Sequence, residues 1–390
     1  MRAAVPRIVF LALLAVIATG CGQNRNNVTT PPSGPSAKCV PATRPTFAYV
    51  LSDSDATISM YTADSCTGAL TPTNPATIPT GVNNGFNAES LAIDSTGKFL
   101  YVANLGSNAT DAATISMFTI DPGTGLLTAT SPSQVPTGYF PQGIAASGNF
   151  VYTANSDDNS VSMFTINTSS GLLSPLSPSE TLVPPVCMSC SSESSPDFVT
   201  VGPTGQFLYV TDQDNGSIST FSINSQTGAL TPTNPPGVNS GVDPWKVVLD
   251  PAGKFAYVPD RDSGFVWMFT VDPTNGTLTP NPAVEVSAGN QPAYMAVHPS
   301  GKFAYVVNRI DGTVSMYSIT GTDGTLVSTG TVPAGSGAYP IALNAAGTFA
   351  YVANQNDGTV SIYSINSNGI LTFERTAETG NNPTSIALVN

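Results

Sequence analysis

Positive side chains are scarce in this chain, so the place where they gather indicates where an anion could bind. The sequence has 12 Lys and Arg against 25 Asp and Glu, a formal net charge of −13. Lys246, Arg261 and Arg309 fall near Trp245 and Tyr294, in two consecutive segments of similar sequence. Guanidinium and ammonium groups bind carboxylates and phosphates, and aromatic rings form apolar or sugar-stacking walls. The cluster predicts a pocket for a small anionic or sugar-like ligand.

Acidic and amide side chains supply further candidates for this pocket. Glu89, Asp197, Asp212 and Asp260 could activate a water molecule, and nothing in the sequence singles out one of them. Asp212, Asp260 and Asn308 also belong to a set of residues that each end a similar apolar run: Ser52, Asn104, Asn155, Asp212, Asp260, Asn308 and Asn354. At strand ends such residues often cap backbone groups, which is the alternative interpretation. Likewise, the arginines could simply neutralise Asp260, Asp262 or Asp311.

These residues lie in a unit that recurs along the chain. Phe-x-Tyr-(Val or Thr) begins at Phe47, Phe99, Phe150, Phe207, Phe255, Phe303 and Phe349. A second apolar run, such as Val-Ser-Met-Tyr from Val314, follows each one, and a weaker Gly-x-Leu-Thr run comes next. Several short strands that repeat every roughly 40 to 50 residues are typical of a β-propeller. We therefore predict an all-β fold of seven four-stranded antiparallel blades, with strands A to D in each.

The two ends of the repeat array predict how the ring closes. The last segment, 383–390, contains a strand A alone, whereas the first repeat, near Thr46, lacks one. The C-terminal strand should therefore join the N-terminal blade and remove the exposed edges. Antiparallel order then puts the D-to-A and B-to-C loops on one face, the top, and the other loops on the bottom. Arg261, Arg309 and Lys246 are predicted to lie on the top, and the single histidine, His298, belongs to an A-to-B turn on the bottom.

Metals, cofactors and nucleic acids are not predicted as ligands. Asp212-x-Asp214-Asn215-Gly216 and Asp260-x-Asp262-x-Gly264 resemble calcium loops, but they lack the later Glu, and hairpin turns explain them better. His298 cannot reach the top cluster, so no histidine base is available there. The strongly negative net charge repels phosphate backbones and argues against nucleic-acid binding.

The N-terminal residues predict export and a lipid anchor. Arg2 and Arg7 precede the apolar run 8–17, which is too short to span a membrane, and Ala18-Thr19-Gly20-Cys21 resembles a lipoprotein cleavage box. This predicts a signal peptide over 1–20, a lipid on Cys21, a disordered tether over 21–42 and the propeller over 43–390. An ordinary secretory signal is the alternative. We expect a monomer attached to the bacterial cell envelope.

Export also favours disulfides among the remaining cysteines. Cys39 and Cys66 flank the first blade on its bottom side and are predicted to pair. Cys187 and Cys190 form a CMSC motif in the longest insertion and are predicted to bridge each other. A redox or zinc role for this motif is weaker, because the surrounding pattern is not thioredoxin-like and two further ligands are missing.

The repeat PAYMAVHPSGKFAYVVN over 292–308 resembles the lactonase family of seven-bladed propellers, and the resemblance extends over 46–390. It is also similar to YVTN-type surface and periplasmic propellers. The family includes a 6-phosphogluconolactonase, which implies a lactone hydrolase acting through Arg309, Arg261 and an acid. The family's Pro-His before strand A corresponds to Pro196-Asp197 and Pro244-Trp245 here, without histidine. The leading interpretation is therefore an exported propeller that binds a small ligand or an envelope protein; a lactone hydrolase and a structural envelope protein are the alternatives.

Overall fold

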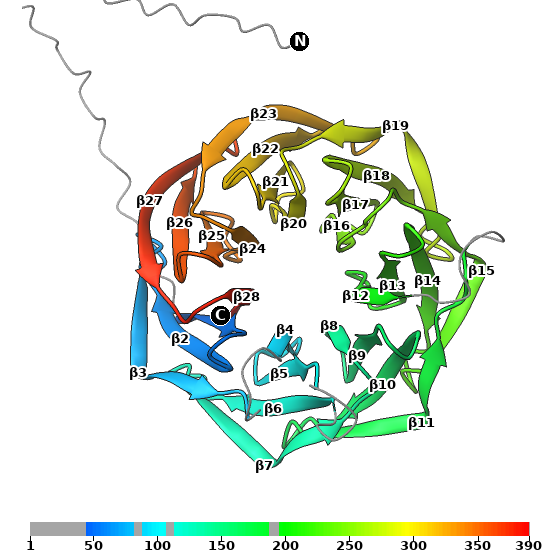
Figure 1. Ribbon diagram of the computed structural model, residues 1–390, viewed down its shortest axis with the longest axis horizontal. Helices are drawn as coiled ribbons and strands as arrows, with labels where there is room; N and C mark the ends of the chain where they lie inside the picture. The colour runs from blue at the N-terminus through cyan, green and yellow to red at the C-terminus, as the bar shows by residue number, and fades with distance from the viewer. Residues whose placement is uncertain (1–43, 82–87, 107–112, 187–194, 390) are drawn as a thin grey trace, which may run out of the picture. The chain divides into compact units, whose positions relative to one another are not determined.

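The computed structural model describes residues 44–81, 88–106, 113–186 and 195–389. Within these residues the chain forms seven four-stranded antiparallel sheets that surround a common axis, as Figure 1 shows. The predicted β-propeller is confirmed. No helix of the described residues is long and apolar enough to cross a membrane.

Each blade runs from an inner strand A to an outer strand D. Blade 1 consists of β28 (Pro383–Val389), β1 (Thr46–Ser52), β2 (Thr57–Ala63) and β3 (Leu70–Pro79). Blades 2 and 3 consist of β4 (Ala88–Ile93), β5 (Phe99–Asn104), β6 (Thr114–Ile120), β7 (Leu127–Pro136), β8 (Pro141–Ser147), β9 (Phe150–Asn155), β10 (Ser160–Ile166) and β11 (Leu173–Leu182).

The remaining blades follow in chain order. Blades 4 and 5 consist of β12 (Pro196–Val201), β13 (Phe207–Asp212), β14 (Ser217–Ile223), β15 (Leu230–Asn239), β16 (Val248–Leu249), β17 (Phe255–Asp260), β18 (Phe265–Val271) and β19 (Leu278–Ser287). Blades 6 and 7 consist of β20 (Pro292–Val297), β21 (Phe303–Asn308), β22 (Thr313–Ile319), β23 (Leu326–Pro333), β24 (Ala338–Leu343), β25 (Phe349–Asn354), β26 (Thr359–Ile365) and β27 (Leu371–Glu378).

The ring closes between the two ends of the repeat array. β28 pairs antiparallel with β1, and Ile386 lies opposite Val50 and Ala387 opposite Tyr49. Blade 1 therefore takes its inner strand from the C-terminal segment, as the sequence predicts. β28 thereby completes the circle of inner strands that surrounds the axis.

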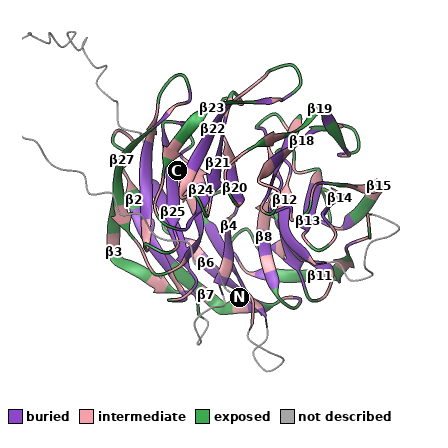
Figure 2. Cartoon of the chain, turned by 45° about the horizontal axis from the view of Figure 1, so that its top comes forward, coloured by how far each residue is buried: buried purple, intermediate pink, exposed green. Residues whose placement is uncertain are grey.

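Burial follows strand position within each blade. β1 is buried along its whole length, whereas the outer strand β3 is exposed at most positions. Figure 2 shows the same gradient from buried inner strands to exposed outer strands. The outer strand differs from the prediction: β3 begins at the Leu of the Gly-x-Leu-Thr run and continues to Pro79. An edge strand tolerates proline and polar residues, so its apolar alternation is lost and its length is hidden in the sequence.

The Phe-x-Tyr motif joins neighbouring blades through a glycine. In blade 5, the Tyr257 hydroxyl donates to the carbonyl oxygen of Gly324 in the next blade (2.8 Å). Gly324 has φ +73°, and a Cβ there would approach the Phe255 ring to 2.4 Å. The same Phe–Gly contact recurs around the ring, at Phe47–Gly125, Phe99–Gly171, Phe150–Gly228, Phe207–Gly276, Phe255–Gly324, Phe303–Gly369 and Phe349–Gly68. We call this contact the inter-blade latch.

Candidate functional site at the top of the axis

The inner strands present one residue each at the top of the axis. In six blades a Pro or Ala of strand A pairs with the last residue of strand B, as Pro292 pairs with Asn308, and in blade 5 Pro244, which precedes β16, forms an isolated bridge with Asp260. The residue after that Pro or Ala begins the inner surface of the ring. These seven residues, the axial tier, differ between blades: Glu89, Gln142, Asp197, Trp245, Ala293, Tyr339 and Thr384.

Aromatic rings fill one side of the axis. Trp245 and Tyr339 of the axial tier have ring centroids 5.8 Å apart. Tyr294, one position further along its strand, packs edge-on against Tyr339 at 4.9 Å. Phe198 contacts Trp245 at 4.7 Å. The indole nitrogen of Trp245 is buried and has no hydrogen-bond partner within the described residues. This wall matches the predicted position of Trp245 and Tyr294 and adds Tyr339.

The two arginines lie against this aromatic wall. The Arg261 guanidinium stacks on Trp245 at 3.9 Å and pairs with Asp243 through its Nε atom (2.9 Å). Arg309 lies 5.4 Å from the Tyr339 ring and donates from Nε to the Gln355 side chain (3.2 Å). The terminal guanidinium nitrogens make no hydrogen bond to any described residue, so they stay available for an anion.

The predicted neutralisation of the arginines therefore needs a correction. Arg261 pairs with Asp243, which precedes strand A, and not with Asp260 or Asp262. Asp260 accepts hydrogen bonds from backbone groups, so its charge is already compensated elsewhere.

Glu89 is the acid that interacts electrostatically with both arginines. It starts the inner surface of blade 2, and its carboxyl makes no hydrogen bond to a described residue. Burial and the carboxylate of Asp53 raise the pKa of Glu89, Arg261 and Arg309 lower it, and the balance is a pKa of about 7. This carboxyl therefore changes its charge near neutral pH and can accept or donate a proton there.

Asp197 is the second buried acid of the axial tier. It accepts a hydrogen bond from the Gln142 side chain (2.6 Å) and another from the backbone nitrogen of Gln213 (3.3 Å). Burial is the main reason that its pKa rises to about 8. Asp197 is thus mostly protonated at neutral pH and leaves Glu89 as the acid with an open carboxylate.

Three predicted residues have structural roles instead of facing the axis. Asn308 accepts from the backbone of Gly289 and donates to Thr313 and Ser315. Asp260 accepts from Val242, Asp243, Ser263 and Trp267, and Asp212 accepts from Ser195 and Asn215. The capping interpretation of the strand B ends describes what these side chains do. Within the described residues no group of three His, Cys, Asp or Glu side chains could hold a metal ion.

Lys246 lies apart from the arginines along the axis. It follows Trp245 in the chain and lines a cavity together with the lower parts of six inner strands. Its ammonium group lies 5.9 Å from the Phe198 ring. Burial lowers the pKa of Lys246, and no charged neighbour contributes to this effect. Lys246 therefore belongs to a different environment from Arg261 and Arg309.

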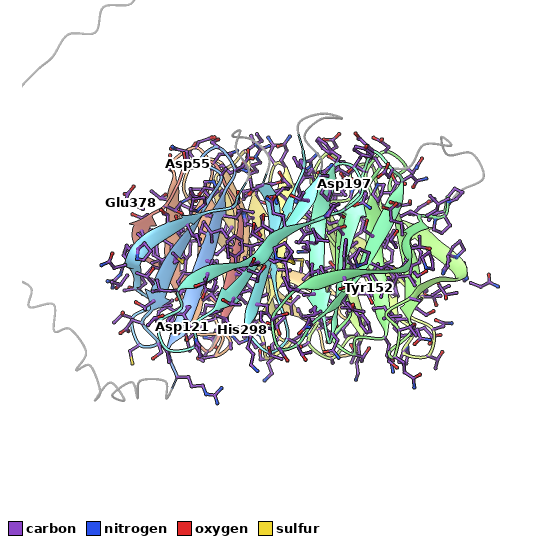
Figure 3. All side chains as sticks on the ribbon, turned by 90° about the horizontal axis from the view of Figure 1, so that it is seen from below. Asp55, Asp121, Tyr152, Asp197, His298 and Glu378 are labelled. Carbon is purple, nitrogen blue, oxygen red and sulfur yellow. The ribbon has the colours of Figure 1, made fainter. Side chains whose placement is uncertain are left out.

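The histidine lies on the opposite face of the ring. Figure 3 shows Asp55 and Asp197 toward one face, and Asp121 and His298 toward the other. The His298 Nε2 atom lies 2.8 Å from the carbonyl oxygen of Gly347, and Nδ1 accepts from the backbone of Ser300. His298 is thus a turn residue, as predicted. Among the cysteines, Cys21, Cys39, Cys187 and Cys190 lie outside the described residues, so lipidation and both disulfides, including that of Cys66, stay predictions.

Some residues of this site were missed from the sequence. Tyr339 and Gln142 occupy the same repeat position as Glu89 and Asp197, directly after the Pro or Ala of strand A. Comparing this one position in all seven repeats would have found both. Gln355, which accepts a hydrogen bond from Arg309, directly follows strand B of the next blade, as Arg261 and Arg309 do in theirs, so comparing that position between repeats would have found it.

The fold agrees with the comparison to known proteins. The family model "Lactonase, 7-bladed beta-propeller" matches residues 23–190, 188–243 and 239–389, so the chain belongs to the lactonase family of seven-bladed β-propellers. No curated protein matches the sequence.

Solved structures show the same fold at low identity. A 6-phosphogluconolactonase candidate from Bacteroides uniformis matches with a TM-score of 0.74 and 20% identity, over 89% of this chain and 100% of that chain. The periplasmic gluconolactonase of Pseudomonas aeruginosa matches with 0.70 and 19%, over 89% and 99%. Hydrazine synthase of Kuenenia stuttgartiensis matches with 0.56 and 19%, over 81% and 94%. Since such different proteins share the fold, the activity has to be argued from the site.

Proposed function

We propose that this protein hydrolyses a lactone at the top of its axis, with Glu89 as the general base. The observation that carries the proposal is a carboxyl with a pKa of about 7 that interacts electrostatically with two arginines and forms no hydrogen bond to a described residue. A base with a pKa near the working pH is half ionised and transfers protons efficiently. Glu89 thus supplies the base for which His298 is too far away.

The reaction needs one water molecule and one proton carrier. The Glu89 carboxylate takes a proton from water, and the resulting hydroxide adds to the lactone carbonyl carbon. Negative charge develops on the carbonyl oxygen, where the terminal nitrogens of Arg261 or Arg309 can stabilise it. The ring carbon–oxygen bond then breaks, and Glu89 returns its proton to the leaving ring oxygen. The product is an open-chain hydroxy acid.

The aromatic wall supports a sugar-like substrate. Trp245, Tyr294 and Tyr339 present apolar ring surface beside the arginines. Sugar rings stack on such surfaces through their C–H groups, while polar and anionic groups of the substrate contact guanidinium nitrogens. The relatives described as gluconolactonases point to the same substrate class, a sugar-acid lactone.

The test is hydrolysis of a panel of five- and six-membered sugar lactones, with and without a phosphate group, corrected for spontaneous ring opening. Glu89→Gln should lower kcat/KM by about 10²- to 10⁴-fold, because it removes the base. Arg309→Gln should cost about 10²-fold, and the exposed Lys302→Gln on the bottom face should change nothing. In the parent protein kcat/KM should rise with pH through about 7. Full activity of Glu89→Gln would contradict the mechanism.

Ligand binding without turnover is the competing function. It would be supported if no lactone is hydrolysed, yet sugar acids raise the melting temperature and Arg309→Gln abolishes this shift. The same panel therefore decides between a hydrolase and a binding protein.

The proposed site of action is outside the cytoplasm, on a lipid anchor at Cys21. The apolar run 8–17 followed by Ala-Thr-Gly-Cys supports this proposal, and the Pseudomonas aeruginosa relative is a periplasmic protein. Cys21→Ser should move the protein from the membrane fraction to the soluble fraction after cell lysis. Continued membrane attachment of this variant would argue against the anchor.

A further inference from the structure

A cavity of about 330 Å³ lies along the lower part of the axis, below the axial tier. It is lined by inner-strand residues of six blades, and most of them are aliphatic, such as Leu91, Met295, Ile341 and Ile386. We call it the lower axial chamber. The arginines and Glu89 do not line it, although Tyr294 of the aromatic wall does, so the chamber adjoins the site argued above from below.

Lys246 is the one positively charged residue among those that line the lower axial chamber, and its ammonium group lies 5.9 Å from the Phe198 ring. This group makes no ion pair and no hydrogen bond to any described residue, in contrast to Arg261, which pairs with Asp243. Glu89 and Asp197 are stabilised by the arginines, and Lys246 does not contribute to their pKa. Lys246 is half-buried, and a partly desolvated cation without a counter-charge is unfavourable, so an anion brought in from solvent would reduce that cost.

The hydroxyl groups that line the chamber restrict which class of anion could bind there. Thr200 donates its hydrogen to the carbonyl oxygen of Val247 (2.8 Å), so it has none left for a ligand. Ser385 accepts from the backbone nitrogen of Leu91 (3.3 Å) and keeps its own hydrogen. Lys246, Ser385 and Tyr294 are therefore the lining residues whose side chains can donate to a ligand, and most of the other lining residues are apolar. A carboxylate with an aliphatic body matches both features.

We propose that the lower axial chamber is a second ligand site, which binds a short aliphatic carboxylate on the ammonium group of Lys246. The volume fits this class: 330 Å³ accommodates about ten non-hydrogen atoms, at about 30 Å³ for each water-sized group. The chamber extends toward the A-to-B turns, so its ligand would enter from the face that carries His298. Substrate and carboxylate would thus use opposite ends of one axis.

Calorimetric titration of the protein with sodium hexanoate at pH 7 tests the proposal. Lys246→Gln should weaken binding by at least about tenfold, because a charged hydrogen bond is lost. Lys254→Gln, at an exposed position of the same blade, should bind hexanoate like the parent protein. Arg309→Gln should also bind it normally, which separates this site from the proposed lactone site.

Two further measurements keep the test independent of folding. Lys246→Met replaces a half-buried charge that has no ion pair by an apolar chain of similar length, so it should raise the melting temperature while abolishing hexanoate binding. Chloride and inorganic phosphate should compete at least about tenfold more weakly than hexanoate, because they leave the apolar walls uncovered. Unchanged hexanoate binding in Lys246→Gln and Lys246→Met, or equal binding of phosphate and hexanoate, would overturn the proposal.

Discussion

The inter-blade latch and the axial tier are built from the same repeat, yet the latch keeps the same residue types in all blades, whereas the axial tier changes its residue type from blade to blade. At the latch, every blade uses a Phe of strand B against a Gly of the next blade, and all seven glycines have positive φ. At the axial tier, one position after the Pro or Ala of strand A carries seven different residue types. In six blades the latch also contains a hydrogen bond from the Tyr hydroxyl to the carbonyl oxygen of this glycine.

This difference distinguishes the residues that maintain the fold from the residues that could carry out chemistry. The latch must recur because neighbouring blades pack in the same way around a closed ring. The axial tier faces a space that all blades share, so each blade can contribute a different group without disturbing its neighbours. Recurring residues therefore describe the scaffold, and the residues that vary between blades describe the site. Solved structures at 19 to 20% identity share the fold with TM-scores of 0.70 to 0.74, so the fold persists while most residue types change.

The largest stability effect should come from breaking one latch. Gly324→Ala places a Cβ against the Phe255 ring and forces alanine into a left-handed conformation. We expect a loss of roughly 3 kcal/mol in the free energy of unfolding. Gly321→Ala, in the same turn, meets no atom within 4 Å and is the matched control. Urea denaturation of both variants checks the prediction, and equal stability of the two would mean that the latch does not constrain the ring.

A smaller effect, with the opposite sign, should come from the axial tier. Burial raises the pKa of Glu89 from the ordinary value of 4.5 to about 7. Between these values the folded protein binds more protons than the unfolded chain, so its stability falls as the pH rises from about 4.5 to about 7. Glu89→Gln removes this titration and should raise the free energy of unfolding at pH 8 by on the order of 2 kcal/mol.

The control for this prediction is the same variant measured at low pH. At pH 4 the folded protein carries Glu89 in its neutral form, so Glu89→Gln and the parent protein should be equally stable. Thermal denaturation at pH 4, 6 and 8 measures the difference. A difference that does not change with pH would mean that Glu89 titrates normally and would weaken its assignment as the base.

The sequence predicts the scaffold better than the site, and the two regions explain why. Phe-x-Tyr, the hairpin turns and the isolated strand at 383–389 recur or pair in ways that one chain makes visible. The axial tier has no recurring residue type, so Glu89 could not be distinguished from Asp212 or Asp260 without knowing which carboxyls cap the backbone.

Two contacts show which features of the site could not be predicted from the sequence. Arg261 pairs with Asp243, which is 18 residues away and reaches it because both flank the same bridge between Pro244 and Asp260. Glu89 meets Arg261 and Arg309 from across the axis, three and four blades further along the ring. Antiparallel order put Glu89, Arg261 and Arg309 on the same face, but it could not give the distance between blades or the pairing with Asp243.

The smallest effect should come from the hydrogen bond of a single latch. Tyr257→Phe removes the hydroxyl that donates to Gly324 and should lower the free energy of unfolding by about 1 kcal/mol. Tyr351 is equally buried, but its hydroxyl donates to no described residue, so Tyr351→Phe should cost less. If the latch acts as one unit, combining Tyr257→Phe with Gly324→Ala should cost less than the sum of the two changes, since alanine already displaces the turn that the tyrosine holds. Urea denaturation of the single and double variants measures this coupling, and strict additivity would show that the ring contact and the hydrogen bond stabilise the blades independently.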